Sequence, residues 1–469
     1  MYKVPFEFSE LGYDEASAMA HDCGFFGNTS DPLLETVVDM LDELGRPDAS
    51  YDVIQIAGTN GKTSTSRYTA AILAGQGKKC ALYTSPELVE MRERMEVGGE
   101  PVSREAFARG ISAAAEAGRR VNARREAAGE DAFRVTEFDL LTCAALVVFA
   151  EAEVDVAVLE VGLGGRWDAT SATHPVVTCV TGIGLDHCRI LGDTLELIAA
   201  EKAAVIKPGQ RCVLGVGTAT PDSMEDVILS RCAEVGVEPV LLRPADPADA
   251  PGEMHPGTPR AHSELLHATY MVTKRPERLG APLELDVTTP RATYPELAAL
   301  KPVYQAANIA CAVCLVEEYL GRALDAEGLF TSVVQCPTPG RFQLMRPEPP
   351  LLIDACHNPQ SVAAFLSAVR AVSPDRASRP LLLCAVLADK DVKGIVDLLS
   401  ADFPRVAVTQ TSSPRALPAT ELADLFAAAG CEVVGTYATV GSALSSICGE
   451  SCVACGSITL AGEVAAAFA

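Results

Sequence analysis

The chain has 469 residues and a formal net charge of −24 at pH 7; 48% of its residues are hydrophobic, 21% charged and 5% aromatic. This length allows two domains that each bury a core, and the composition is typical of an α/β protein. The negative charge argues against a general nucleic-acid surface and favours a small-molecule partner held by local positive charge. No apolar run approaches the length that spans a bilayer, and the acidic start does not resemble a signal peptide, so no membrane partner is expected.

The sixteen cysteines mostly lie inside apolar runs, as small core residues do. We therefore expect reduced thiols and a cytoplasmic protein. Two pairs, Cys311 with Cys314 and Cys452 with Cys455, have the spacing of a zinc knuckle. The patterns around them are helical and strand-like, which favours structural cysteines over zinc.

The first half of the chain alternates between helical and strand patterns. An amphipathic helix is predicted over 32–44, with Leu33, Val37, Met40, Leu41 and Leu44 on one face. Further helices are predicted over 63–73, 103–128 and 137–150, and strands over 53–57, 80–83, 154–160 and 176–181. Strands that alternate with helices predict right-handed crossovers and a largely parallel sheet.

The segment from Val53 to Ser66, VIQIAGTNGKTSTS, predicts a phosphate cradle after a buried strand. Glycines in its turn let the backbone approach an anion, and the amides at the start of the next helix point at that anion. Lys62 adds positive charge, and the hydroxyls of Thr63 and Ser64 add a magnesium contact. Ile56 stands where the usual P-loop has its first glycine, so a plain strand-to-helix turn remains the alternative for this loop taken alone.

Four strand ends each deliver a polar group: Lys62, Ser85, Glu160 and His187. Ligands of parallel sheets collect at the carboxyl ends of the strands, so these groups are expected to converge on phosphate or magnesium. Glu160 follows the apolar run VDVAVL, and a lone buried carboxylate is costly unless it is paired or bound to a metal. His187 forms either a packed polar pair with Asp186 or part of the metal site. The position of Lys202 in a helical pattern predicts a solvated lysine.

The signal is weak from 217 to 300, where a surface loop is predicted over 244–262 and strands near 267–272 and 283–287. A helix over 304–319 and a proline-containing linker, QCPTPGRF, come next. A second alternating unit follows, with strands over 351–354, 381–387, 405–409, 432–436 and 452–455, and helices over 361–372 and 419–429. Its period is Rossmann-like. No dinucleotide-type glycine fingerprint opens it, so NAD is not expected.

The second unit also carries candidate site residues. Asp354 and His357 lie in IDACHNP directly after a strand, where they either begin a helix or face the first domain across a cleft. The guanidinium of Arg341 in the linker can reach phosphates through its bidentate fork. Ser412 follows another strand end, in a segment with Ser413 and Arg415 that is suited to hold a carboxylate.

Together, these segments resemble the folylpolyglutamate synthase/dihydrofolate synthase family of the Mur ligase superfamily. The resemblance runs from about Gly27 to Glu463 and is weak only from 217 to 300. The stretches that carry it are IAGTNGKTST, YTSPEL, TEFDLLT, VLEVGLGGRWDAT, GIGLDHCRILGDTLELIAAEKAAVIKP, YQAANIA, PGRF, IDACHNP and LADKD.

The resemblance implies a P-loop ATPase domain over 1–335 that includes the variable segment 217–300, a linker over 336–342, and a smaller Rossmann-like glutamate-ligase domain over 343–469. It assigns ATP to Asn60, Gly61, Lys62, Thr63, Ser64, Asn308, Arg341 and Asp354. It assigns two magnesium ions, with room for a monovalent cation, to Ser85, Glu160, His187 and a carbamylated Lys202, which reverses the expectation from the position of Lys202. It implies that the pterin part of the substrate is held by Thr136, Glu137, Phe138, Asp139, Trp167, Asp168 and Ala169, and the incoming glutamate by His357 and Ser412.

The implied reaction has two steps, catalysed with Lys62, Glu160, His187, Lys202 and Arg341. ATP phosphorylates a carboxylate of dihydropteroate or of a folate glutamate tail, and the amino group of L-glutamate then attacks the acyl phosphate and expels phosphate. Positive charge is needed because the anionic carboxylate and the phosphoryl group repel each other. Domain closure is expected to exclude water, and a monomer is expected.

Several residues depart from the family pattern and bear on the substrate contacts. Thr63 is typical of the murein ligases, Glu87 stands where a histidine is usual, and Cys356 stands where an alanine is usual. Tyr304 replaces a histidine, and Trp167 replaces a smaller apolar residue.

Two other functions compete with this interpretation. A Mur-type ligase of a cell-wall nucleotide precursor usually carries a full nucleotide-sugar domain before the P-loop, and only 57 residues precede Gly58. A nucleotide-binding regulatory protein without ligase activity would be suggested by loss of Lys62, Glu160 or His187, and all three are present.

Overall fold

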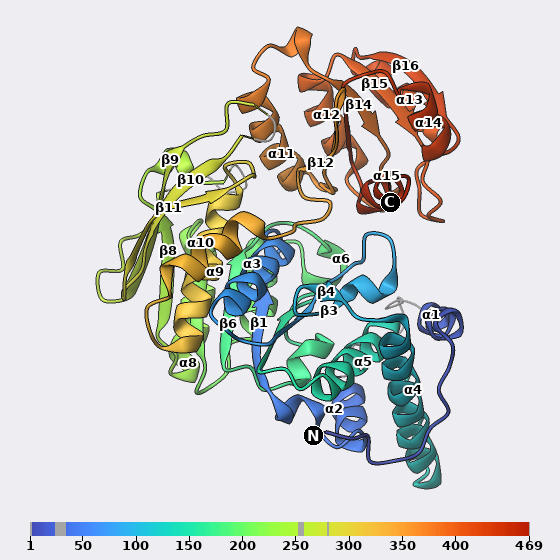
Figure 1. The fold of residues 1–469 in the computed structure, drawn as a ribbon. Coiled ribbons are helices and arrows are strands. Elements are labelled where there is room, and N and C mark those ends of the chain that lie inside the picture. Colours follow the sequence, from blue (N-terminus) through green and yellow to red (C-terminus); the bar gives the residue numbers. More distant parts are fainter. Residues whose placement is uncertain (1, 24–33, 252–257, 279–280, 469) are drawn as a thin grey trace.

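The structure is a computed structural model that describes residues 2–23, 34–251, 258–278 and 281–468. It contains two sheets (Figure 1). The first sheet has the strand order β11-β10-β9-β8-β7-β6-β1-β5-β2-β3-β4. Its strands are β1 (Asp52–Ala57), β2 (Cys80–Tyr83), β3 (Met95–Val97), β4 (Glu100–Pro101), β5 (Val156–Glu160), β6 (Val177–Gly182), β7 (Arg211–Gly217), β8 (Pro239–Pro244), β9 (Leu266–Lys274), β10 (Leu283–Thr288) and β11 (Thr293–Ala299).

The centre of the first sheet is parallel, as predicted: β1 pairs in parallel with both β5 and β6, and β5 with β2. The strands at both edges are antiparallel. Helices cover both faces: α1 (Tyr13–Asp22), α2 (Leu34–Glu43), α3 (Lys62–Gly75), α4 (Arg104–Ala127), α5 (Glu137–Glu151), α6 (Cys188–Leu191), α7 (Leu195–Ala203), α8 (Asp222–Val235), α9 (Gln305–Leu320) and α10 (Ala326–Gln335).

The core of this sheet is split between its two faces because its central strands are apolar on both sides. One apolar cluster lies between the sheet and α3, α9 and α10, and another lies beneath α1, α2, α4 and α5. Strands that are buried on both faces read as continuous apolar runs rather than as alternating patterns. The run in β1 is an example, since Val53 to Ala57 are all buried.

The second sheet has the strand order β12-β13-β17-β14-β15-β16 and lies above the first sheet in Figure 1. Its strands are β12 (Gln343–Pro347), β13 (Pro350–Ile353), β14 (Leu381–Cys384), β15 (Arg405–Thr409), β16 (Glu432–Tyr437) and β17 (Cys452–Cys455). Its helices are α11 (Pro359–Val372), α12 (Val392–Asp402), α13 (Ala419–Ala428), α14 (Val440–Ser446) and α15 (Ile458–Ala466). Apolar clusters fill both faces of this sheet, so it forms a domain with its own core.

The two domains touch through the loop after β2. Leu88 of that loop packs against the core of the second domain. A Cβ built on Gly340 would lie 3.1 Å from the Leu88 side chain, and one on Gly462 of α15 would collide with the Leu88 backbone. Glycine at these two positions therefore permits the close approach of the domains.

Most predicted elements are present with ends shifted by a few residues, and the predicted α/β fold with two sheets is confirmed. The segment from 217 to 300, where the sequence signal is weak, contains elements that the sequence did not predict, including α8, β8 and β11. Outside that segment, α10 and β12 were also missed. The predicted loop over 244–262 contains a short 3-10 turn, Pro247–Asp249. Residues 252–257 of that loop, and Pro32 and Leu33 of the first predicted helix, lie outside the described residues.

All sixteen cysteines are free thiols. Cys311 and Cys314 lie buried in α9, and Cys452 and Cys455 lie buried in β17. Within the described parts of the chain, no helix is long and apolar enough to cross a membrane.

Candidate active site

The phosphate cradle connects β1 to α3 and comprises residues 58–64. Gly61 precedes the first turn of α3 with a φ of 81°, a left-handed value that glycine adopts without strain. A Cβ at Gly61 would lie 2.6 Å from Oδ1 of Asn308, and one at Gly58 would collide with Thr181. The unpaired amides at the start of a helix attract anions. The loop therefore has the close backbone approach and the helix start that a phosphate site needs, despite Ile56.

Glu160 ends β5 beside the cradle and is 2% exposed. Its Oε1 accepts a hydrogen bond from Thr63 Oγ1 at 2.9 Å, and its Oε2 accepts from the Ser85 amide at 3.4 Å. Burial raises the pKa of the Glu160 carboxyl, while the positive charge of Lys62 opposes that shift. The predicted convergence of Lys62, Ser85 and Glu160 is thus present, because β1, β5 and β2 are neighbours in the sheet.

Two lysine side chains donate to backbone carbonyls of the cradle. Lys62 Nζ donates to the carbonyls of Gly58 and Thr59, at 3.0 Å each, and Lys202 Nζ donates to Gly58 at 2.8 Å. Lys202 is 5% exposed, so the interpretation of it as a solvated lysine was wrong. Burial, with a further contribution from Lys62, lowers the pKa of Lys202 to about 7. About half of the amine is therefore neutral at that pH.

Asp186 and His187 lie in the loop after β6, which faces the second domain. The His187 amide donates to Asp186 Oδ1 at 2.9 Å, and the His187 side chain is 46% exposed. From the second domain, Asn358 Nδ2 reaches Asp186 Oδ2 at 3.3 Å, and Lys390 Nζ lies 3.5 Å from Oδ1. The Asp186 carboxylate therefore joins the two domains, a role that the sequence did not predict.

Asp354 follows β13 and is buried at the boundary between the domains. Its carboxylate accepts from the amides of Phe342 at 2.8 Å and Cys356 at 2.9 Å, and from the Tyr304 hydroxyl at 3.2 Å. Burial raises the pKa of Asp354, and the nearby charge of Arg341 opposes the shift. Arg341, Asp354 and the start of α9 are therefore brought together, as predicted for the ATP site.

His357 lies two residues before the first turn of α11. Its Nδ1 is 2.9 Å from the Ala355 carbonyl, and burial lowers the pKa of its imidazole to about 4. The ring is therefore neutral at neutral pH, with the proton on Nδ1 and a free lone pair on Nε2. The next residue, Asn358, caps α11, so this segment both begins a helix and faces the first domain.

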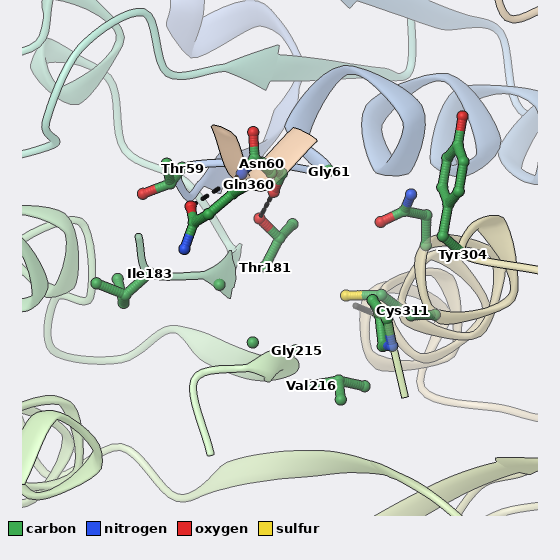
Figure 2. Close-up of a pocket in the computed structure, with 15 residues that line it drawn as sticks. Thr59, Asn60, Gly61, Thr181, Ile183, Gly215, Val216, Tyr304, Cys311 and Gln360 are labelled. Carbon is green, nitrogen blue, oxygen red and sulfur yellow. Dashed lines mark hydrogen bonds between the residues drawn. The ribbon is translucent and has the colours of Figure 1, made fainter. Parts of the chain in front are cut away.

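A cavity lies between the cradle, the end of β7 and the start of α9 (Figure 2). Its volume is about 40 Å³, enough for a few waters and far below the roughly 300 Å³ of a small ligand pocket. Gln360 of α11 reaches into it, and Asn60 Nδ2 donates to Gln360 Oε1 at 3.2 Å. A Cβ on Gly184 would collide with the Gln360 amide. Gln360 therefore narrows the site from the second domain. The cavity is lined by Thr59, Asn60, Gly61, Thr181, Gly182, Ile183, Gly215, Val216, Gly217, Pro251, Tyr304, Ala307, Asn308, Cys311 and Gln360.

We expect Gln360→Ala to lower the Kd for ADP about three- to tenfold. The Gln360 side chain must leave the cradle before phosphates enter, and the variant removes that step together with one net hydrogen bond of about 1 kcal/mol. Isothermal titration with ADP measures the change. Gln410→Ala, in a loop of the second domain, is the matched control. A weaker Kd for Gln360→Ala would show instead that the Gln360 amide binds the nucleotide.

The two segments predicted to hold the pterin part of the substrate meet in the structure. A Cβ on Gly162 would contact the Phe138 ring at 2.6 Å, and the Phe138 ring lies 5.8 Å from that of Tyr83. Thr136 and Asp139 cap the start of α5 through reciprocal hydrogen bonds. The other segment is folded around Asp168, whose carboxylate accepts from the amides of residues 162, 163 and 170; Ala169 is buried, whereas Trp167 is 51% exposed.

Glu137 and Glu87 share a buried cation that the sequence did not single out. Arg94 is 6% exposed; its guanidinium contacts the Glu87 carboxylate and lies 3.0 Å from Glu137 Oε1. Glu87 therefore pairs with Arg94 and helps to hold the loop after β2 against α5. The signal for this role was present in the sequence as the arginine that ends a charged run, MRER.

We expect Arg94→Met to lower the free energy of unfolding by about 3–5 kcal/mol, because it leaves the buried carboxylate of Glu137 and the partly exposed carboxylate of Glu87 without their shared cation. Urea denaturation measures the change. Adding Glu87→Gln to Arg94→Met should recover part of the loss. A loss below about 1 kcal/mol would contradict the role given to Arg94.

The structure does not bring Ser412 to the cradle. The Ser412 amide and hydroxyl both donate to Glu463 Oε1 of α15, at 2.6 and 2.9 Å. Ser64, by contrast, lies in the cradle, but its hydroxyl accepts from Gln305 of α9 at 3.1 Å. Asn308 is beside it and donates to Gln305 at 2.9 Å, so α9 supports the cradle from below.

Oxygen ligands suited to magnesium gather at Glu160. No group of three or more His, Cys, Asp or Glu side chains in the described ranges is placed to hold a metal ion. The Glu160 carboxylate and the Thr63 hydroxyl nevertheless offer the few hard oxygens that suffice for an ion whose other ligands are phosphates and waters. The residues present therefore fit magnesium held largely by a nucleotide.

Comparisons with known proteins agree with this geometry. Residues 340–456 match the family model "Mur ligase, glutamate ligase domain". The dihydrofolate synthase/folylpolyglutamate synthase of Mycobacterium tuberculosis is 34% identical over 400 residues, which cover 84% of this chain and 77% of that protein. The crystal structure of Mycobacterium tuberculosis folylpolyglutamate synthase complexed with ADP and AMPPCP superposes with a TM-score of 0.82 at 27% identity and covers 97% of this chain and 99% of that one. A folylpolyglutamate synthase–AMPPCP–folate complex gives a TM-score of 0.77 at 25% identity, covering 97% and 98%.

The two-domain fold, the cradle and the matched C-terminal domain define an ATP-dependent ligase of the Mur ligase superfamily. The identity and coverage of the relatives then identify the family within this superfamily. The chain belongs to the folylpolyglutamate synthase/dihydrofolate synthase family. The Mur-type cell-wall ligase and the regulatory protein without ligase activity are not supported, because the matched relatives are folate ligases.

Proposed function

We propose that this protein joins L-glutamate to dihydropteroate or to the glutamate tail of a folate, with ATP as the second substrate and an acyl phosphate as the intermediate. The observation that carries the proposal is the meeting of the cradle, Lys62 and Glu160 with Arg341 and Asp354 at the domain boundary. Relatives of similar fold are complexed with ADP, AMPPCP and folate, which supports these substrates.

Charge explains how this site would bring two anions together. The substrate carboxylate and the terminal phosphoryl group repel each other, and Lys62 of the first domain and Arg341 of the linker would offset that repulsion. Lys62 is positioned by two backbone carbonyls of the cradle loop, so its charge is fixed before the nucleotide arrives. Closure of the domains would exclude the water that competes for an acyl phosphate.

Magnesium would be held by Glu160 with Thr63, Ser85 and His187, and a carbamylated Lys202 would support a second ion; a monovalent cation is a further expectation. The ions would supply positive charge at the phosphates. The neutral Lys202 amine is the form that reacts with carbon dioxide, and the lowered pKa of Lys202 supports this proposal.

The structure supports the proposed pterin and glutamate contacts to different degrees. Phe138, Asp168 and the exposed Trp167 would form the pterin site, with Thr136, Glu137, Asp139 and Ala169 holding its walls in place. The lone pair on Nε2 of neutral His357 would face the incoming glutamate. Ser412 can bind that glutamate only if Glu463 first releases it.

We also propose domain limits of 1–335 and 343–469 with a linker over 336–342, a monomeric state, and action in the cytoplasm on small molecules rather than on nucleic acid or membranes. The two sheets fall on either side of the proposed linker. The sixteen free thiols support a reducing compartment.

The proposal is tested by phosphate release with ATP, magnesium and L-glutamate, offering dihydropteroate in one reaction and a reduced folate monoglutamate in the other. Release with dihydropteroate alone identifies a dihydrofolate synthase, release with folate alone a polyglutamate synthase, and release with both a bifunctional enzyme. A reaction in which neither acceptor stimulates phosphate release above the rate without acceptor would overturn the proposal.

A further inference from the structure

A second cavity, of about 280 Å³, lies beside the nucleotide site. One of its walls is α11 of the second domain. The opposite wall comes from the segments that follow β9 and β11 in the first domain, near the upper left of Figure 1. Tyr304 lines both this cavity and the smaller one beneath the cradle. The volume approaches the lower end of the range for small-molecule sites.

Small and flat side chains shape the cavity. Ala364, Ala368 and Ala371 share one face of α11, since they are spaced by four and three residues, and they leave room where larger residues would fill the gap. The rings of Tyr304 and Phe342, both half-buried, also line the cavity. Aromatic side chains of this kind can stack against a planar ring.

The charge of the cavity is one-sided. Lys301 is half-buried in its wall; its Nζ donates to the Arg341 carbonyl at 3.3 Å. Burial lowers the pKa of Lys301, and the nearby charge of Asp354 opposes that shift. Arg275 also lines the cavity but is paired with the buried Asp249. None of the described lining residues is acidic. In a chain with a net charge of −24, a cavity whose charged described lining residues are all basic, Arg275, Arg278 and Lys301, is complementary to an anion.

We propose that this cavity binds a planar aromatic anion, with the ring between Tyr304, Phe342 and the alanine face of α11 and the anionic group at Lys301. The site shares Pro251 and Tyr304 with the smaller cavity beneath the cradle and lies between the domains. A ligand there contacts both domains and fixes Tyr304, whose hydroxyl bonds to Asp354.

Such a ligand should oppose nucleotide binding. It stabilises the domain arrangement seen here, in which Gln360 narrows the nucleotide cavity to about 40 Å³. A ligand that prefers one arrangement shifts the population towards it, and the effect on the other ligand is reciprocal. This coupling rests on the proposed function, whereas binding of the aromatic anion does not.

The test is a fluorescence titration of the full chain with 1-anilinonaphthalene-8-sulfonate, with the stoichiometry fixed by equilibrium dialysis. We expect one saturable site. Ala368→Trp should weaken binding at least tenfold by filling the cavity, and Lys301→Met several-fold by removing the charge. Ala428→Trp on exposed α13 and Lys393→Met on exposed α12 are matched controls that should leave the Kd unchanged.

Titration with ADP then separates the possible relations of the two sites. Saturating ADP should raise the dye Kd by a few-fold to a plateau, the sign of a ternary complex. Full displacement of the dye by ADP would place the cavity in the nucleotide site and overturn the proposal, and an unchanged dye Kd would overturn the coupling. Absence of a saturable site, or a Kd unchanged in both cavity variants, would overturn the binding site itself. If ADP fails to bind while the dye binds as expected, the proposed function fails and this site stands.

Discussion

Glu160→Gln is expected to lower ATP turnover about 10³-fold while leaving the fold intact. Glu160 is the buried carboxylate beside the cradle, where it accepts from Thr63 and faces the charge of Lys62. The amide of glutamine keeps the volume and can still accept from Thr63, but it removes the negative charge that would hold a divalent cation. Steady-state release of ADP with magnesium measures the effect.

The loss of ATP turnover in Glu160→Gln must come from the altered site and not from unfolding of the protein. Circular dichroism and the thermal midpoint of Glu160→Gln should stay close to those of the wild type, because the substitution also removes the cost of burying a charge. Glu234→Gln, at an exposed position at the end of α8, is the control and should turn over ATP normally. ATP turnover by Glu160→Gln within a few-fold of wild type would contradict the proposed role of Glu160 in catalysis.

Lys202→Ala is expected to lower kcat about 10²- to 10³-fold, with partial rescue by acetate. Lys202 is buried under the cradle beside Lys62, and an alanine there leaves a hole that a small carboxylate can enter. Rescue by a carboxylate distinguishes a lost carbamate from lost packing. Lys393→Ala, at an exposed position, is the control and should show neither the loss nor the rescue.

The same lysine gives a pH dependence with a defined sign. Only the neutral amine reacts with carbon dioxide, and the pKa of about 7 means that the neutral fraction falls as the pH drops below 7. Enzyme stripped of carbon dioxide should therefore regain activity faster at pH 8 than at pH 6, provided that the two buffers hold the same concentration of dissolved carbon dioxide. Equal rates at the two pH values, or full activity without carbon dioxide, would exclude the carbamate.

The sequence predicted the cradle and Glu160 because their signals are local. A turn with glycines after a buried strand, and a carboxylate at the end of an apolar run, are both visible within a few residues. The parallel order of β6, β1, β5 and β2 then brings the strand ends together. Lys202 was misread from its position because its burial depends on the packing of α7 against the cradle, which a helical pattern does not reveal.

Contacts across the domain boundary could not be predicted from the sequence, because they join residues that are far apart in the chain. Gln360 and Asp186 make their contacts with partners 300 and 172 residues away. Ser412 was expected to hold a carboxylate, and it does so, but the carboxylate is that of Glu463 on α15. Of the antiparallel strands between residues 217 and 300, β9 and β10 were predicted and β11 was missed. Exposed and buried positions do not alternate regularly along β11, so its sequence shows no clear strand pattern.

Mass spectrometry of the folate product after incubation with ATP, magnesium and L-glutamate tests the proposed ligase reaction directly. We expect a dihydropteroate or reduced folate whose mass has grown by one glutamyl residue, with one ADP formed per residue added. Glu160→Gln should yield no such product in the same time. Formation of ADP without any glutamylated product, under conditions where the acceptor stays intact, would contradict the ligase function itself.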